Sequence, residues 1–339
     1  MSAQAPCLSQ QALAGLALAS AYASAHSPFD EPHCLLVALD DGPPCAPAQL
    51  PRLAQWLRAQ ACPVIGIGTR PGGIAAACDT VLSDPADAAT LIANIGRAPI
   101  AAMTLVQVLR ATREMPAADA LTVESLAYSM LQAGPEFRRW SAEHPPSAGS
   151  IPTDPGPAVE IERDGSTLRL QLNRPSSRNA MTIEMRDALV EAFDLAATDD
   201  SIAAIELRAR GACFSTGGAL EEFGTAADPA SAHAVRSLRL PAAALLRSRA
   251  ATHVHVHGAC IGSGIELPAF ARRLTASPGA FFQLPEIRFG LIPGAGGCVS
   301  IARRIGSQRT AFLALSARRI NTATALEWGL VDAIVPPAG

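Results

Sequence analysis

Three glycine-rich turns in the second half of the chain each follow an apolar stretch that is typical of a buried strand. They are CFSTGGALEEF (213–223), HGACIGSGIELPAF (257–270) and GLIPGAGGCVSIARRIG (290–306). Glycine lets backbone N–H groups approach a ligand closely, and a helix that starts at such a turn adds the positive end of its dipole. The alternation of strands and helices predicts an α/β fold with a largely buried sheet, in which two turns could converge on one oxygen atom.

The first half of the chain shows a shorter α/β pattern followed by helices. HCLLVALDD (33–41) and CPVIGIG (62–68) are apolar runs bounded by proline and glycine, and LPRLAQWLRAQ between them has helical spacing. This pattern predicts a β-α-β unit. From about Pro85 the spacing becomes helical, and we expect three helices, the last over ADALTVESLAYSMLQAGPEFRRWSAEH. The five prolines of HPPSAGSIPTDPGP (144–157) then predict a linker.

Two local signals follow the linker. AVEIERDGSTLRLQLNRP alternates apolar and polar residues around Asp164-Gly165, which predicts a β-hairpin. TIEMRDALVEAFDLAATDD has the spacing of an amphipathic helix, with Thr182 available as its N-cap.

Composition excludes several classes of function. All 27 basic residues are arginine, so no lysine is present to form a Schiff base. The net charge of -3 gives no reason to expect a nucleic-acid partner. The 8 cysteines form no CxxC pair, which favours reduced core residues and a cytoplasmic location. No uninterrupted apolar run reaches the ~18 residues of a membrane span, and the apolar stretch from Cys7 lacks a preceding basic residue, which favours a buried helix over a signal peptide.

The segment THVHVHG raises the question of a metal site. Its alternation places His253, His255 and His257 on one face of a strand, and that spacing alone could support zinc. An ordinary strand leading into the next glycine-rich turn fits equally well. We expect the strand and no metal.

From about Val159 to Pro336 the chain resembles the crotonase, or enoyl-CoA hydratase, superfamily. The resemblance rests on LNRPSSRNAMTIEM, FSTGGALEEF, HGACIGSGIEL, LPEIRFGLIPGAGG and ALEWGLVDAIVP, in that order. It implies a crotonase (ClpP-like) β-β-α superhelix core over residues 159–339. Before that core we expect a degenerate α/β segment (1–90), a helical lid (91–145) and a linker (146–158). In the family the lid helices follow the core, so the chain looks rearranged, with its lid packing on its own core or on a neighbour's.

The resemblance also implies roles for individual residues. The backbone N–H groups of Gly218 and Ser263 would form an oxyanion hole for the thioester carbonyl of an acyl-CoA. Glu266 would act as general base and Glu286 as the acid that protonates the α-carbon. The remaining substrate or CoA contacts implied by the family are Arg174, Arg178, Ala180, Thr216, Gly217, Gly262, Pro293 and Gly294. Without the family pattern, the two glutamates would be read as a dipole-stabilising surface residue and an ion-pair partner.

We therefore expect the reversible syn hydration of a 2-enoyl-CoA, with no cofactor beyond the CoA thioester. The alternatives are isomerisation or dehydration through the same enolate, and a non-catalytic scaffold. The family also leads us to expect a homo-oligomer, a trimer or hexamer. Tyr22 and Tyr128 both precede the core, which argues against the branch of the family that uses a phenol.

Overall fold

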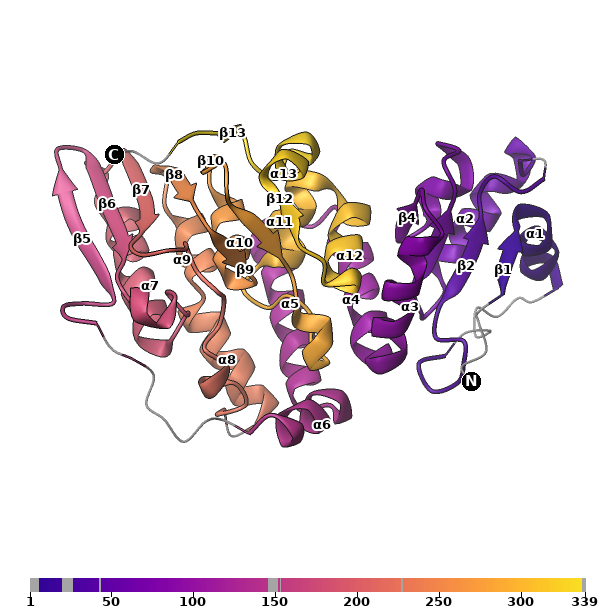
Figure 1. Cartoon of the computed structure of the whole chain (residues 1–339), viewed down its shortest axis with the longest axis horizontal. Helices are drawn as coiled ribbons and strands as arrows, with labels where there is room; N and C mark the ends of the chain where they lie inside the picture. Colours follow the sequence, from indigo (N-terminus) through magenta and orange to yellow (C-terminus); the bar gives the residue numbers. More distant parts are fainter. Residues whose placement is uncertain are drawn as a thin grey trace.

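The computed structural model describes residues 6–19, 27–42, 44–145, 152, 154–226 and 228–336. Its second half contains a six-stranded sheet with the order β13-β10-β8-β7-β6-β5, parallel except for the β5–β6 pair (Figure 1). The strands are β5 (Val159–Asp164), β6 (Thr167–Leu172), β7 (Ala204–Ala209), β8 (Ala251–Val256), β10 (Arg273–Ala276) and β13 (Ala333–Ile334). The predicted hairpin is confirmed, because Asp164 pairs with Thr167 across the turn.

A three-stranded sheet, β12-β11-β9, carries the strands next to two of the glycine-rich turns. Its strands are β9 (Ala259–Ile261), β11 (Phe281–Gln283) and β12 (Ile320–Asn321). The helices of this half are α7 (Ile183–Thr198), α8 (Pro229–Arg239), α9 (Pro241–Arg247), α10 (Ser263–Glu266), α11 (Gly297–Ile305), α12 (Ser307–Ser316) and α13 (Thr322–Trp328). The predicted N-cap of α7 is confirmed, since the Thr182 hydroxyl accepts from the N–H of Met185 at 3.2 Å.

Short 3-10 turns connect several of these elements. They are η3 (Pro175–Ser177), η4 (Leu220–Glu222), η5 (Pro268–Phe270) and η6 (Glu286–Phe289). The third glycine-rich turn therefore differs from its prediction: η6 separates it from β11, so it does not follow a strand directly.

The first half begins with a four-stranded parallel sheet, β1-β2-β3-β4. The β-α-β prediction is confirmed by β2, α2 and β3. The elements here are β1 (Cys7–Ser9), α1 (Gln10–Ala19), β2 (Leu35–Ala38), η1 (Pro47–Gln49), α2 (Leu50–Arg58), β3 (Val64–Ile67), η2 (Gly73–Ala77) and β4 (Thr80–Leu82). Leu13 and Ala17 are buried, so one side of α1 faces the core.

Four helices follow this sheet: α3 (Ala86–Arg97), α4 (Pro99–Ala111), α5 (Ala117–Gln132) and α6 (Pro135–Glu143). The prediction of a single helix at the end of this region was wrong, because the helix is interrupted between α5 and α6. Gly134 has ψ 164°, outside the helical range, and Pro135 begins α6. A residue that precedes proline is pushed away from helical geometry, and proline cannot donate to the preceding turn.

These helices pack on the second half of the same chain. Helices α4 and α5 contact α11, α5 also contacts α8 and α9, and α3 contacts α12. The side-chain amide of Asn94 on α3 donates to the carbonyls of Leu315 and Ser316, at 2.9 and 3.0 Å. The boundaries proposed at residues 90 and 145 stay predictions. Residues 146–151 and 153 of the linker lie outside the described part of the chain.

One hydrophobic core runs through both halves. Leu36 and Ile65 of the first sheet belong to the same buried cluster as Phe214 and Leu274. Alternation along β2 turns Leu35 to the opposite face, where a smaller cluster is covered by α1 and α2. The first sheet is therefore covered on both faces, as parallel sheets usually are, and one of those faces is completed by the rest of the chain.

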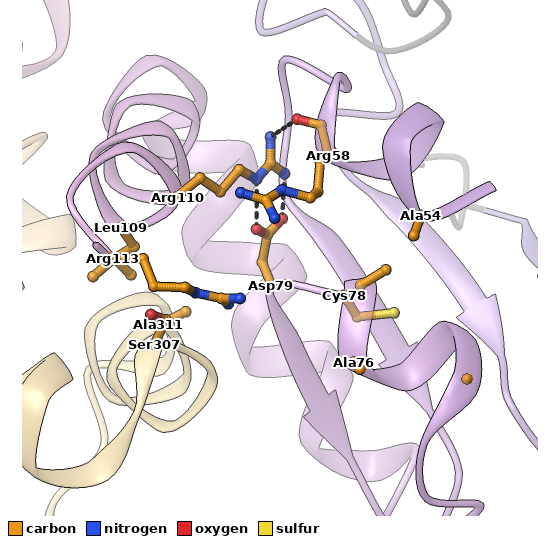
Figure 2. A pocket seen from close by; sticks show the side chains of 12 residues that line it. Ala54, Arg58, Ala76, Cys78, Asp79, Leu109, Arg110, Arg113, Ser307 and Ala311 are labelled. Atoms are coloured by element: carbon orange, nitrogen blue, oxygen red, sulfur yellow. Dashed lines mark hydrogen bonds and ion pairs between the residues drawn. The ribbon is translucent and has the colours of Figure 1, made fainter. Parts of the chain in front are cut away.

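An ion pair joins the first sheet to helix α4 (Figure 2). Arg110 Nε donates to Asp79 Oδ1 at 2.7 Å, and Arg110 Nη1 also donates to the carbonyls of Arg58 and Gln60, at 3.1 and 2.6 Å. Asp79 Oδ2 accepts from the N–H of Val64 at 2.8 Å. The side chains of Arg110 and Asp79 are only 15% and 7% exposed. Because water screens these two charges less, their attraction is stronger than that of an exposed pair.

No single helix of the described residues is long and apolar enough to span a membrane. Helices α3 and α4 are long and apolar enough only when taken together, and the chain bends by 108° between them.

Replacing Asp79 with asparagine is expected to lower the free energy of unfolding by about 3 kcal/mol, because it leaves a largely buried guanidinium without its anion. Urea unfolding measures the loss. The control is Asp194→Asn, which breaks the Arg247–Asp194 pair, whose side chains are 51% and 46% exposed, and should cost less than about 1 kcal/mol. Equal losses in the two variants would contradict this interpretation of the pair.

Candidate active site

The first two glycine-rich turns lie directly against each other. Ile261 N donates to the carbonyl of Ser215 at 3.1 Å. A Cβ atom on Gly217, which has φ 90°, would lie 2.8 Å from the carbonyl oxygen of Ile261. One on Gly264 would lie 2.5 Å from the carbonyl oxygen of Ser215. Only glycine allows this approach, and the approach brings Gly218 and Ser263 to one cavity.

The cavity has a volume of about 390 Å³ and is lined by residues from both halves of the chain. Five of the predicted site residues line it: Gly218, Ser263, Glu266, Glu286 and Gly294. Other lining residues come from α5 (Tyr128, Gln132), from α7 and the segment before it (Met181, Ile183, Arg186), and from α8 and its continuation (Val235, Arg236, Arg239, Leu240).

The two predicted oxyanion donors are available to a ligand. In the described structure, the N–H of Gly218 and that of Ser263 donate to no carbonyl or side chain, whereas Gly217 N donates to the hydroxyl of Ser215 and Gly262 N to the carbonyl of Gln283. The buried hydroxyl of Ser263 also has no partner among the described residues. Buried polar groups are normally hydrogen-bonded, so free ones in a cavity indicate a ligand or water site.

Glu266 is the last residue of α10 and is 2% exposed. Its Oε2 accepts from the N–H groups of Ala295 and Gly297, at 2.7 and 2.9 Å. Burial raises the pKa of Glu266 to about 7, against the opposing effects of these two N–H groups and of the Arg236 charge. The carboxyl can therefore gain or lose a proton near neutral pH.

Glu286 begins η6 and is 8% exposed. Its Oε2 is buried without a hydrogen-bond partner in the described part of the chain. Burial, followed by the charge of Glu266, raises the pKa of Glu286 well above its ordinary value. A Cβ on Gly262 would lie 2.7 Å from Glu286 Oε1 and 3.8 Å from Glu266 Oε1, so both carboxyls flank the same point.

A third buried carboxyl comes from the first half of the chain. Glu124 on α5 is 1% exposed, and its two oxygens accept from the N–H groups of Gly296 and Cys298, at 2.6 and 2.8 Å. Burial raises its pKa well above the ordinary value, and the charge of Glu266 adds to the effect. The four successive N–H groups of residues 295–298 are thus bound alternately by Glu266 and Glu124.

Tyr128, one turn after Glu124, forms a wall of the cavity. A Cβ on Gly294 would lie 2.1 to 2.6 Å from three atoms of the tyrosine ring, so the ring packs directly on that glycine. Burial raises the pKa of the phenol to about 12. Tyr128 therefore removes the ground for the expectation against the phenol-using branch, which took the second half alone to build the site. Tyr22 lies outside the described residues.

The two predicted arginines lie away from this cavity. The side chain of Arg174 is buried against the chain itself, with Nη2 2.7 Å from Glu184 Oε1 and Nη1 2.7 Å from the carbonyl of Asn173. Arg178 is exposed on the turn after η3, where its carbonyl accepts from the N–H of Thr216. The structure gives Arg174 an internal role, and contact of Arg178 with substrate stays a prediction.

The remaining predicted residues do not line the cavity. Gly217 accepts from the N–H of Met181, which does line it, at 2.8 Å. Gly262 lies next to both carboxyls, as described above. Pro293 belongs to the third turn, where a Cβ on Gly297 would lie 2.8 Å from the Cβ of Pro293. Ala180 precedes Met181, and Thr216 precedes Gly217. Their contacts with substrate stay predictions.

The three histidines occupy β8 and the residue after it. His255 lies 3.0 Å from the hydroxyls of Thr275 and Ser277, one on each ring nitrogen. His257 Nε2 lies 2.9 Å from the carbonyl of Gly211. Within the described ranges, no group of three histidine, cysteine or acidic residues is arranged to hold a metal ion.

Sequence reasoning missed Glu124, Tyr128 and Arg236. A signal for the first two was present, because Glu124, Tyr128 and Gln132 recur every four residues and so share one face of the predicted helix. Polar residues at that spacing on a helix that is otherwise apolar indicate a buried polar face. No comparable pattern marks Arg236.

Replacing Glu124 with glutamine is expected to lower the pKa of Glu286, because the charge of Glu124 raises it in the native protein. Carbon-13 NMR of labelled glutamate side chains can follow the titration. The matched control is Glu136→Gln on α6, a carboxyl that likewise accepts from two backbone N–H groups, at 2.7 and 2.9 Å, but does not act on Glu286. An unchanged titration in the Glu124 variant would show that the three carboxyls are not coupled.

Comparison with known proteins identifies the family. The family model described as enoyl-CoA hydratase/isomerase matches residues 162–339. A 2,3-dehydroadipyl-CoA hydratase of Escherichia coli (strain K12) is 32% identical over 177 residues, which cover 52% of this chain and 68% of that protein. A cyclohexa-1,5-dienecarbonyl-CoA hydratase of Thauera aromatica is 35% identical over 179 residues, covering 52% of this chain and 66% of that protein. The match thus spans about two thirds of these relatives' length.

Solved structures agree with the sequence comparison. The crystal structure of an enoyl-CoA hydratase/isomerase from Mycobacterium abscessus superposes with a TM-score of 0.50 and 29% identity, over 53% of this chain and 71% of that chain. The chain therefore belongs to the enoyl-CoA hydratase/isomerase family: it is a hydratase-like enzyme with the crotonase fold.

Proposed function

We propose that the protein catalyses the reversible syn hydration of a 2-enoyl-CoA thioester. The observation that carries the proposal is a pair of buried carboxyls, Glu266 and Glu286, whose Oε1 atoms both lie near Gly262. The same cavity presents the free N–H groups of Gly218 and Ser263. Two carboxyls of different proton affinity beside two backbone donors are the groups that addition of water to a conjugated thioester requires.

The two N–H groups bind the thioester oxygen. When water adds to the β-carbon, the electrons of the double bond move onto this oxygen and form an enolate. Donors already in place stabilise that charge without reorganising, an effect commonly worth about 3 kcal/mol for one donor. The close approach of the two turns at Gly217 and Gly264 holds the donors together before substrate arrives.

The carboxyls move two protons. Ionised Glu266 accepts a proton from water as the water oxygen bonds to the β-carbon. Protonated Glu286 then gives its proton to the α-carbon, and the enolate returns to a thioester carbonyl. Both groups act from the same side of the substrate, which makes the addition syn. Transfer of a proton from Glu266 back to Glu286 restores the starting state.

The environments of the two carboxyls support this assignment. The pKa of Glu266 is about 7, so its ionised form is available at neutral pH. The pKa of Glu286 is raised well above its ordinary value by burial and by the charge of Glu266, which favours its protonated form. Pairs of carboxyls whose environments separate their pKa values divide the roles of acid and base in this way.

The relatives support the reaction class, since the two curated proteins described above are both named as CoA-thioester hydratases. We propose acyl-CoA as the substrate, with no cofactor, because the residues of the cavity supply the acid, the base and the oxyanion donors themselves. We further propose a cytoplasmic homo-oligomer, a trimer or hexamer, in keeping with the family expectation.

Glu266→Gln and Glu286→Gln are each expected to lower kcat/KM for hydration by roughly 100- to 10,000-fold, because each removes a proton-transfer group. The loss of enoyl-thioester absorbance with crotonyl-CoA measures the rate. Glu327→Gln, an exposed residue of α13, is the control and should retain wild-type activity. Loss of activity in only one of the two variants would favour an isomerase, and no effect in either would favour a scaffold.

The rate of hydration should fall as the pH is lowered below about 7, because Glu266 then becomes protonated and can no longer accept a proton from water. A single such group gives a tenfold fall in kcat/KM per pH unit well below its pKa. Above pH 7 the rate should hold until Glu286 loses its proton. A rate that instead rises on acidification would contradict the role of Glu266 as base.

A further inference from the structure

Arg236 is a cation in the cavity wall on the side of the catalytic carboxyls. It extends from α8 over the ring of Tyr128, with its Cζ atom 4.1 Å from the ring centroid. Two contacts join α8 to α5 near Arg236. The hydroxyl of Ser125 lies 2.9 Å from His233 Nδ1, and Arg236 Nη2 donates to Gln132 Oε1 at 3.1 Å. Its position is therefore determined by the packing of α8 on α5.

Arg236 has unused hydrogen-bonding capacity. Besides the bond to Gln132, it donates from Nη1 to the carbonyl of Ala232 at 3.3 Å, while a guanidinium carries five N–H donors. No carboxylate of the described residues lies within 4.0 Å of its nitrogens, whereas Arg186 in the same cavity pairs with Asp187 at 2.8 Å. A partly buried cation without an anion has lost hydration that no ion pair replaces.

Arg236 lies on the side of the cavity that holds the catalytic carboxyls, because the Tyr128 ring beneath it packs on Gly294, next to the Ala295 N–H that donates to Glu266. The carbonyl position is given by Gly218 and Ser263, and the carboxyls stand over the double bond. Burial dominates the pKa of Glu266 and of Tyr128, and the positive charge of Arg236 lowers both. Arg236 is therefore close to the carboxyl side of the cavity.

A second arginine that lines the cavity, Arg186, has different neighbours. Arg186 lies beside Glu222, whose pKa is raised by burial and lowered by the charge of Arg186. Met181 and Ile183 line the same cavity and follow the segment in which the family resemblance leads us to expect CoA contacts. A substrate that enters past these residues and reaches the carboxyls would direct its acyl end toward Tyr128 and Arg236.

Much of the remaining lining of the cavity is apolar. It includes Ala219, Ala232, Val235, Leu240 and Pro241. Such a surface suits methylene groups. Arg236, and Arg239 one turn later on α8, line the cavity without an ion pair among the described residues, and such a guanidinium suits an anion at the end of the chain. A carboxylate matches the planar fork of a guanidinium with two parallel hydrogen bonds.

We propose that the enzyme selects 2-enoyl-CoA thioesters whose acyl chain ends in a carboxylate, and that Arg236, held on Tyr128 and Gln132, binds that carboxylate. The inference rests on the proposed function for the identity of the thioester, and it adds the substrate class. Arg236 is a specificity residue in this scheme and takes no part in the proton transfers.

The test compares two six-carbon substrates that differ only at the far end, trans-2-hexenoyl-CoA and its ω-carboxylate counterpart. Wild-type enzyme should favour the acidic substrate in kcat/KM by roughly 10- to 100-fold, the range of a hydrogen-bonded charge pair. In Arg236→Gln this preference should fall to about onefold to threefold, within the scatter of such measurements. Arg249→Gln, an exposed arginine after α9 that does not line the cavity, should keep the wild-type preference.

Binding of the saturated analogues, hexanoyl-CoA and adipyl-CoA, measured by calorimetry, tests the inference without turnover. Preference for adipyl-CoA that disappears in Arg236→Gln would support it even if neither enoyl substrate were hydrated, which would overturn only the proposed reaction. Equal affinity of wild-type enzyme for both analogues would overturn the inference. An equal loss of affinity for both in the variant would also overturn it, because it would place Arg236 on the CoA phosphates.

Discussion

The site depends on one set of hydrogen bonds, in which two carboxylates bind the four N–H groups of residues 295–298. Glu266 comes from the second glycine-rich turn and Glu124 from a helix of the first half. Together they fix the start of α11, and the bonds to Glu266 Oε2 leave its Oε1 directed toward Gly262 and Glu286. The catalytic geometry, the third turn and the docking of α5 are therefore parts of one structural unit.

Burying three carboxyls together is unfavourable unless protons are retained, and this constraint is what gives the site its chemistry. Burial is the largest cause of the raised pKa at Glu124, Glu266 and Glu286. Glu266 has two N–H partners that favour its ionised form, whereas Glu286 has an oxygen with no partner among the described residues. The difference in hydrogen bonding therefore separates a base from an acid, and the continuous core around them supplies the stability that the cluster lacks.

Local features were predictable from the sequence, and contacts between distant segments were not. The hairpin at Asp164-Gly165 and the cap at Thr182 follow from short-range patterns and are confirmed. The family motifs led to Gly218, Ser263, Glu266 and Glu286, which line one cavity. Arg174 is placed against Glu184 instead, because a motif records a residue type but not its partner. The spacing of Glu124 and Tyr128 puts them on one helix face, but it does not specify that α5 packs with this face against the site.

The bond from Gly296 to Glu124 spans 172 positions of the chain, and this separation has a consequence for biosynthesis. A ribosome completes α5 long before the turn that satisfies Glu124 exists. Until then the Glu124 carboxyl has no backbone donors, so it must stay hydrated or keep a proton, and burial of the inner face of α5 is unfavourable. Domains commonly fold in order as they emerge, N-terminal first. In this protein the contacts of Glu124 on α5 cannot form until the last third of the chain has been made. During that interval the nascent protein exposes the residues of α5 that line the active site.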